Sequence, residues 1–401
     1  MAVTLDADCM PLSDYVVEHI DHVRHLELRD GPMGDVTTVL TRLNRPAPML
    51  ESVNIFCDVR GTLQTFLHTP PRACATLFSL KFINHLFTYA ETDLPPKQYT
   101  YGEVPDVLER MPALEVLYVH RVLSLGPASM GTSRSISFPR LNELSLGSVL
   151  NSCCSLVANL ALPAHTSVHM ICHPFSHTWE DCQLLVPFMA KRVAAAAAIH
   201  VVEHLAIYSL SDMDITLTIG PLEARRAPSS ALPFNVVITF SLSGGAIIRR
   251  LVEAFCAVLP LGGLRELSVF TGLESWWRPQ HWQEMLRPVQ CVETVNVRGT
   301  AAMHLVSSLA WESCAGEPAE EAPSLLFPAL ETLAMWGLTI HDDTSETLCS
   351  DYELVGALVH RTHKAPLETL RFLRYNVQKK WIEKIEAIVP TVTLDFDAQF
   401  P

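Results

Sequence analysis

Residues 112–119 read Pro-Ala-Leu-Glu-Val-Leu-Tyr-Val, and this stretch decides the fold. The same phrase returns as Pro-Met-Leu-Glu-Ser-Val-Asn-Ile at 48–55 and as Pro-Ala-Leu-Glu-Thr-Leu-Ala-Met at 328–335. Residues 139–146 repeat it with Asn142 in place of the glutamate. A phrase that recurs through a chain predicts a repeated structural unit, in which each copy buries its apolar face against its neighbours.

The apolar residues of the phrase have the Leu-x-x-Leu-x-Leu spacing of a leucine-rich-repeat strand. Between the candidate strands, apolar residues such as Leu251, Phe255 and Leu259 recur with the period of a helix, as do Trp381 and Ile385. Thirteen candidate strands follow, spaced 24 to 38 residues apart with a mean of about 31. Their first apolar positions are Val23, Leu50, Leu77, Leu114, Leu141, His165, Val202, Asn235, Leu264, Val292, Leu330, Leu367 and Thr391.

A strand followed by a helix in each repeat predicts an α/β leucine-rich-repeat solenoid. We expect an irregular horseshoe, with parallel strands on the concave face and helices on the convex face. Residues 1–19 are assigned to an N-terminal leader, and residues 20–401 to a repeat domain of about thirteen irregular repeats. Polar insertions at 91–102, 220–231 and 315–323 predict surface loops. The expected core includes Leu26, Leu28, Leu117, Leu144, Leu146, Leu205, Leu267, Leu333 and Leu370.

Composition limits the classes of function. The net charge is −14 with only 29 lysines and arginines, so we expect no nucleic-acid partner. Eleven cysteines, without a Cys-x-x-Cys pair, indicate a reduced protein of the cytoplasm or nucleus. No apolar run approaches the ~18 residues that a membrane-spanning helix needs, so we expect no membrane partner.

Two histidine patterns are candidates for metal binding. Residues 200–204, His-Val-Val-Glu-His, match a zinc-protease motif that requires a helix, but Val202, Leu205 and Ile207 fit the register of a strand. In a second set, histidines recur at every fourth residue from 165 to 177, and prolines at 163 and 174 bracket or interrupt the segment. We therefore expect these histidines to lie in a strand and in loops rather than on a helix. We therefore predict no cofactor, no metal site and no enzymatic activity. The second set is His165, His169, His173 and His177.

Two stretches carry a resemblance to a known family. Residues 138–147, Phe-Pro-Arg-Leu-Asn-Glu-Leu-Ser-Leu-Gly, and residues 327–333, Phe-Pro-Ala-Leu-Glu-Thr-Leu, resemble the repeats of fungal F-box/leucine-rich-repeat proteins. The resemblance extends over residues 20–396, which is nearly the whole chain. It implies that the repeats select a protein substrate, while an F-box docks on the Skp-type adaptor of a cullin ubiquitin ligase.

No F-box is visible in residues 1–19, where Met-Pro-Leu at 10–12 is interpreted as a remnant of one. Residues 1–401 are therefore expected not to bind a Skp-type adaptor, which would bind only if an F-box lay upstream. The predicted function is a protein-interaction module, the substrate-recognition repeat domain of an F-box-type ubiquitin-ligase receptor. The alternative is a stand-alone leucine-rich-repeat scaffold with no ligase connection.

The residue that follows each third apolar position should face away from the core, because strand side chains alternate. This column predicts the concave, partner-binding face, and it carries large side chains of the types that anchor interfaces. We predict that changing Tyr208, Phe270 or Trp336 to Ala weakens partner binding by about 2 kcal/mol or more and leaves the fold intact. The predicted partner-binding residues are Phe56, Tyr208, Phe270, Arg298 and Trp336, with Tyr118 on the neighbouring column.

Overall fold

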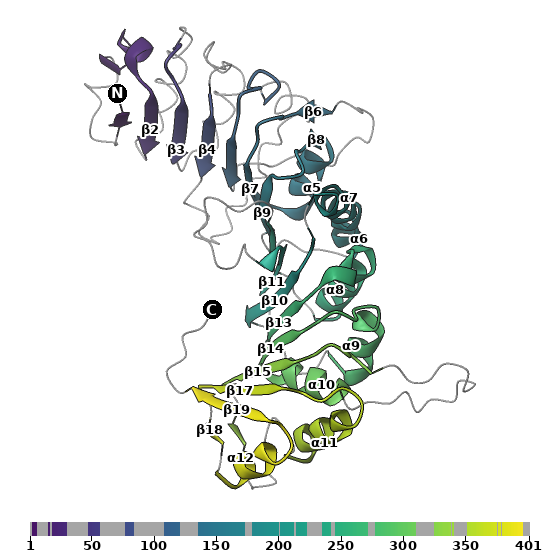
Figure 1. Cartoon of the computed structure of the whole chain (residues 1–401). Helices are drawn as coiled ribbons and strands as arrows, with labels where there is room; N and C mark the ends of the chain where they lie inside the picture. The colour runs from purple at the N-terminus through teal and green to yellow at the C-terminus, as the bar shows by residue number, and fades with distance from the viewer. Residues whose placement is uncertain are drawn as a thin grey trace, which may run out of the picture. The chain divides into compact units, whose positions relative to one another are not determined.

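The computed structural model divides the chain into two compact units, Met1–Phe188 and Met189–Pro401. Both units are mixed α/β, and their strands run mostly parallel (Figure 1). The division falls within helix α7 (Leu185–Ala197). The residues that the structure describes are 2–5, 15–16, 18–29, 47–56, 77–83, 108–120, 135–172, 179–199, 201–211, 214–222, 235–241, 245–271, 277–309, 325–337, 339–340, 351–374, 376–377 and 379–395.

The first unit contains a sheet in which each neighbouring pair of strands is parallel. Helix α5 (Leu150–Ala158) packs on two of these strands, β7 and β9, and on helix α6 (Trp179–Gln183). The 3-10 turn η1 (Ile20–His22) and a short parallel pair, β6 (Ile136–Ser137) with β8 (Leu160–Ala161), also belong to this unit. Across the sheet the strands are β1 (Ala2–Leu5), β2 (His25–Arg29), β3 (Ser52–Phe56), β4 (Ser79–Ile83), β5 (Val116–His120), β7 (Glu143–Ser148) and β9 (Ser167–Cys172).

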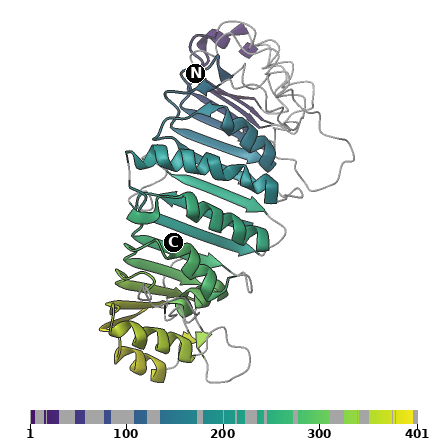
Figure 2. The same cartoon turned by 90° about the vertical axis from the view of Figure 1, so that its right-hand side faces the viewer.

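The second unit contains a sheet with helices on one face, as the green and yellow ribbons of Figure 2 show. Across the sheet the strands are β12 (Val236–Ser241), β11 (Asp214–Gly220), β10 (His204–Ser211), β13 (Glu266–Thr271), β14 (Thr294–Arg298), β15 (Thr332–Trp336), β17 (Thr369–Leu373) and β19 (Thr391–Asp395). The helices are α8 (Gly245–Val258), α9 (Pro279–Leu286), α10 (Thr300–Ser308), α11 (Asp351–Thr362) and α12 (Lys379–Glu386). The 3-10 turn η4 (Leu261–Gly263) and the parallel pair β16 (Thr339–Ile340) with β18 (Asn376–Val377) also belong to this unit. Within the described ranges, no helix combines the length and apolarity that crossing a lipid bilayer requires.

Each of the thirteen predicted strand positions coincides with a strand. The nine leucines predicted for the core are all buried, with exposed fractions of 2% or less. The helical stripe at Leu251 and Phe255 forms the buried side of α8, and the stripe at Trp381 and Ile385 forms that of α12. The alternation of apolar and polar residues therefore located these thirteen strands, and in all but the last it identified the side that packs inward.

Strand β11 contradicts the expectation of parallel strands throughout. It lies between β10 and β12 and is antiparallel to both. Residues 220–231 were predicted as a surface loop, but Gly220 is instead the last residue of β11. The remainder of that stretch from 223, and the predicted loops at 91–102 and 315–323, lie outside the described residues.

The register of the last strand differs from the prediction by two residues. Strand β19 pairs with β17 so that Leu370 lies opposite Val392 and Phe372 opposite Leu394. The first apolar position of this repeat is therefore Val389, which is 2% exposed, and not Thr391. The column that faces away from the core consequently ends at Asp395 rather than at residue 397.

A repeated backbone contact sets the strands in one register within each unit. The carbonyl of Glu51 accepts hydrogen bonds from the N–H groups of Phe78 (2.8 Å) and Ser79 (3.0 Å), where β4 begins. In the second unit the carbonyl of Glu331 accepts from Glu368 and Thr369 at 3.0 Å each. Because the same carbonyl is used in successive repeats, equivalent side chains line up in columns across the strands.

The Phe-Pro-x-Leu phrases form turns that lead into strands, with the Phe and the Leu buried and the two residues between them exposed. Phe138 and Phe327 are both 0% exposed, and their carbonyls accept from the N–H groups of Leu141 and Leu330 at 3.2 and 3.1 Å. Arg361 of α11 donates at 2.8 Å to the carbonyls of Leu326 and Phe327, which satisfies these acceptors in the interior. Burial lowers the pKa of Arg361 to about 10.

Candidate functional site

One face of the first unit's sheet is lined by side chains that are not part of the core. In β5, Leu117 and Val119 are buried, whereas Val116, Tyr118 and His120 are half-buried and point to the other side. We call this side the open face, and the corresponding side of the second unit's sheet, opposite α10, carries the same name. The open face is where the sequence predicted partner contacts.

Tyr118 lies at the centre of a group of interacting side chains on the open face. Its hydroxyl donates a hydrogen bond to the Glu143 carboxylate of the next strand, β7. On the other side, the Lys81 ammonium of β4 lies 4.5 Å from the centre of the Tyr118 ring, in cation–π contact. The His120 ring stacks beside it, with centroids 6.1 Å apart, and His120 Nε2 lies 2.7 Å from Ser145 Oγ. These five residues from three adjacent strands form what we call the Tyr118 cluster.

Gly147 permits the close approach of His120 to β7. A β-carbon at position 147 would lie 3.0 Å from His120 Cγ, which is closer than side chains normally pack. The absence of a side chain there lets the imidazole lie across the strand and reach Ser145. The Tyr118 cluster therefore depends on a small residue as well as on its polar groups.

The surroundings of the Tyr118 cluster shift the pKa values of two side chains, Tyr118 and His169. Burial, and then the hydrogen bond to Glu143 and its negative charge, raise the pKa of Tyr118. Burial lowers the pKa of His169 on β9, although the Glu143 charge opposes that shift. At neutral pH the Tyr118 phenol is therefore protonated, and the His169 imidazole beside the cluster favours its neutral form.

The pair formed by His120 and Ser145 has the residue types of a nucleophile and its base, but it lacks the exposure that catalysis requires. Ser145 is only 1% exposed, which keeps its hydroxyl away from any substrate on the surface. A nucleophile must reach the reacting carbon, and this one is covered. The contact between the two side chains is therefore best explained as a hydrogen bond that positions His120.

Phe56, another predicted contact residue, is half-buried on the open face near the edge of the first unit. The Arg29 guanidinium of the neighbouring strand lies 5.8 Å from the centre of its ring, and Arg29 also pairs with Glu27. Arg29 is exposed, so the edge presents a cation lying over an aromatic ring. This arrangement resembles that of Lys81 over Tyr118 in the same sheet.

The predicted contact residues of the second unit lie in one column of its open face, but they are largely buried. Tyr208 stacks on Phe270 with centroids 5.2 Å apart, and Phe270 meets Trp336 edge-on at 6.4 Å. Phe270 is 2% exposed and Trp336 is 9% exposed; Tyr208 is half-buried against them. Arg298, between Phe270 and Trp336 in the register, is exposed. Because the rings are buried, we now expect their loss to affect the fold first.

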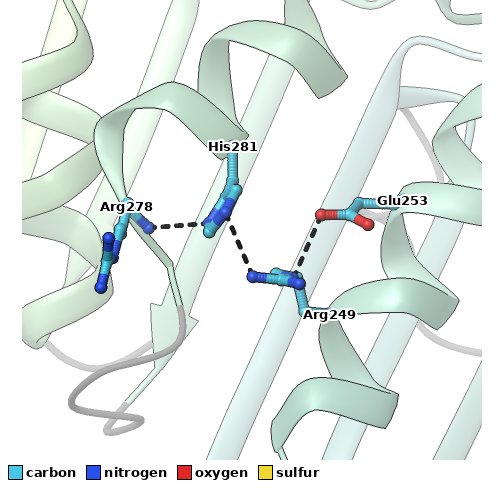
Figure 3. A network of polar contacts seen from close by, with 4 residues as sticks. All are labelled: Arg249, Glu253, Arg278 and His281. Carbon is cyan, nitrogen blue, oxygen red and sulfur yellow. Dashed lines mark hydrogen bonds and ion pairs between the residues drawn. The ribbon is translucent and has the colours of Figure 1, made fainter.

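A polar network lies on the helix-covered side of the second unit, where α8 meets α9 (Figure 3). The Arg249 guanidinium contacts His281 Nε2 at 3.1 Å and the Glu253 carboxylate at 3.4 Å. His281, in the first turn of α9, also accepts a hydrogen bond from the backbone N–H of Arg278 at 3.1 Å, through its Nδ1. These contacts cap α9 and link it to α8, which is a structural role.

The two histidine patterns fall on or beside strands. His204 opens strand β10, and residues 201–203 are not helical; residue 200 lies outside the described part of the chain. His169 lies within β9 and His165 in the turn before it, whereas positions 173 and 177 also fall outside it. Among the described residues, no three histidine, cysteine or acidic side chains are grouped so as to hold a metal ion.

We expect Tyr118 to ionise at higher pH than an ordinary tyrosine. Because its folded-state pKa is raised, the neutral phenol stabilises the fold below about pH 10, and this contribution is lost as the pH rises further. The measurement is a titration of absorbance at 295 nm for the wild type minus Tyr118→Phe. A difference curve with its midpoint at the ordinary value for tyrosine would show that Tyr118 is neither buried nor hydrogen-bonded to Glu143 in solution.

Comparisons with known proteins identify no family for the chain. No protein-family model matches it, and no curated protein matches it. Among solved structures, it is similar to a crystal structure of a protein from Bacteroides fragilis at 12% identity and a TM-score of 0.27. That match covers 94% of this chain and 76% of the other.

Proposed function

We propose that this protein is a leucine-rich-repeat solenoid that binds a protein partner through the open face of its first unit. The observation that carries the proposal is the Tyr118 cluster, in which a large aromatic ring, an ammonium and a carboxylate are held at a half-buried surface. Side chains that are already ordered lose little conformational freedom on binding, which favours affinity. Aromatic residues with a polar tip are also among the commonest anchors of protein interfaces.

The repeat assignment rests on the columns of equivalent residues described above. One carbonyl in each of several repeats accepts from two N–H groups of the next, and the inward leucines are buried in both units. Strands followed by helices, stacked in one register, are the arrangement that a leucine-rich repeat requires. A covered serine beside His120 supports a binding role over a hydrolytic one.

A substrate receptor of an F-box-type ubiquitin ligase is the more specific form of this proposal. It rests on the resemblance of the Phe-Pro-x-Leu repeats at 138–147 and 327–333 to those of fungal F-box proteins. In that role the partner would be a ligase substrate, and the open face would select it. Without a ligase connection, the same surface would serve a stand-alone scaffold.

The test of the binding surface is the affinity of a purified partner for Tyr118→Ala. We expect the dissociation constant to rise about 30-fold, corresponding to about 2 kcal/mol, because an anchor ring is removed. Tyr15→Ala is the matched control, since Tyr15 is 55% exposed and lies outside the sheet. Isothermal titration calorimetry of both variants, with circular dichroism to confirm folding, measures the difference. Equal affinities for the two folded variants would exclude this surface.

The ligase connection is tested separately. The protein is precipitated from its own cells, and the precipitate is probed for a Skp-type adaptor and a cullin. Their presence in stoichiometric amount supports the receptor; a precipitate that holds the partner without them favours the scaffold. Since the partner affinity of Tyr118→Ala is measured without the adaptor, the two results are independent.

A further inference from the structure

Four cysteines that are separated in the sequence meet in the interior of the first unit. Cys153 and Cys154 lie on α5, Cys172 is the last residue of β9, and Cys182 lies on α6. Helix α5 packs against both of the other elements. Cys153, Cys172 and Cys182 are 0% exposed, and Cys154 is 6% exposed.

Two of these thiols touch. Cys172 and Cys153 are joined by a side-chain hydrogen bond, while Cys154 and Cys182 lie close enough to influence Cys172 electrostatically. All four are reduced. Two thiols in hydrogen-bond contact, on elements that already pack together, need only a small movement to reach the length of a disulfide.

We propose that Cys153 and Cys172 are an oxidation site, which forms a reversible disulfide that joins helix α5 to strand β9. The oxidant is a small-molecule disulfide such as glutathione disulfide. One cysteine thiolate attacks it, forming a mixed disulfide and releasing one glutathione thiolate. The second cysteine thiolate then attacks the sulfur of the first, the mixed disulfide breaks, and a second glutathione thiolate leaves. The two protein thiol protons pass to the released glutathione thiolates.

The surroundings set the rate of this reaction. The contact with Cys153, and then burial, raise the pKa of Cys172, so the reactive thiolate is scarce in the closed fold. Oxidation therefore requires local opening around α5, β9 and α6, and it should be slow. Two other cysteines provide internal comparisons. Cys291 is exposed and should react first, whereas Cys256 is buried on α8 and burial raises its pKa to about 12.

The experiment incubates the whole protein with glutathione disulfide until the mass spectrum stops changing. Remaining thiols are then alkylated, and the protein is digested with pepsin at acid pH, where thiol exchange stops. We expect peptides carrying Cys153 and Cys172 to be linked with the loss of two hydrogens, and dithiothreitol to reverse the link. The thermal midpoint of the first unit should rise by at least about 2 °C on oxidation, because the link restricts the unfolded chain.

Adjacent variants give the matched control. Cys153→Ala should abolish the cross-link, while Cys154→Ala, one position along the same helix, should retain it. Circular dichroism establishes that both are folded, and Cys172→Ala gives a second variant without the pair. The proposal is overturned if Cys153 and Cys172 are still reduced, and are therefore found alkylated, after Cys291 has fully reacted with glutathione disulfide. The same incubation in urea below the unfolding transition must also leave both thiols reduced. A cross-link that persists in Cys153→Ala, to Cys154 or Cys182, would also overturn it.

Discussion

Phe270→Ala should lower the free energy of unfolding of the second unit by about 3–5 kcal/mol, the range for removing a buried phenylalanine ring. The ring is 2% exposed, and it contacts Tyr208 on one side and Trp336 on the other. Its loss would leave a cavity lined by Trp336 and Leu373. Urea unfolding followed by tryptophan fluorescence measures the change, with the transition of the first unit as an internal reference.

The control for Phe270→Ala is Arg298→Ala, which alters the adjacent residue of the same column. Arg298 is exposed, so its replacement should change stability by less than about 1 kcal/mol. If Phe270→Ala were no more destabilising than this, the ring would be accessible in solution. The prediction that Tyr208, Phe270 and Trp336 are partner contacts would then regain its basis.

Leu333→Ala should lower the free energy of unfolding of the second unit by about 2–5 kcal/mol. Leu333 is 0% exposed at the second apolar position of its repeat, between Val295 and Leu370 in the register. Leu394→Ala is the control, because Leu394 occupies an apolar position of the last strand yet is 39% exposed. Denaturant midpoints of the two variants give the comparison. Similar losses in both would mean that the leucine columns do not form the core as described.

Most of the fold was predictable because strand side chains alternate and the leucine spacing marks most of the strands. The antiparallel strand β11 was missed although Ile215, Leu217 and Ile219 alternate with polar residues in the same manner. Only Gly220 of this strand lay in the predicted insertion, and residues 214–219 were left without an element between the strands expected at Val202 and Asn235. The last strand was misplaced for a similar reason, since Val389, Val392 and Leu394 fit the spacing better than the residues chosen.

The sequence predicted which face of the sheet carries the candidate site, but it did not predict how exposed the side chains on that face are. Alternation places Tyr118 and Phe270 on the open face of their sheets, and the structure agrees. Alternation does not show whether other parts of the chain cover that face, so it could not decide whether Phe270 is buried. The partners of Tyr118 were also hidden, because Lys81 and Glu143 come from neighbouring repeats and meet it only once the strands are in register.

The cysteines show the same limitation in another form. The sequence contains eleven cysteines without a Cys-x-x-Cys pair, and nothing in it indicates that Cys153 and Cys172 meet. Cys153 and Cys172 meet only because α5 folds back onto β9. Contacts between different elements depend on the packing of the repeats, which local pattern does not encode.

The binding face is the central claim, and an experimental structure of the protein with its partner tests it most directly. We expect the partner to lie on the open face of the first unit and to contact the Tyr118 ring and the Lys81 side chain. The hydrogen bond between Tyr118 and Glu143 should remain in the complex. A partner bound on the helix-covered side, with Tyr118 left uncovered, would contradict the account.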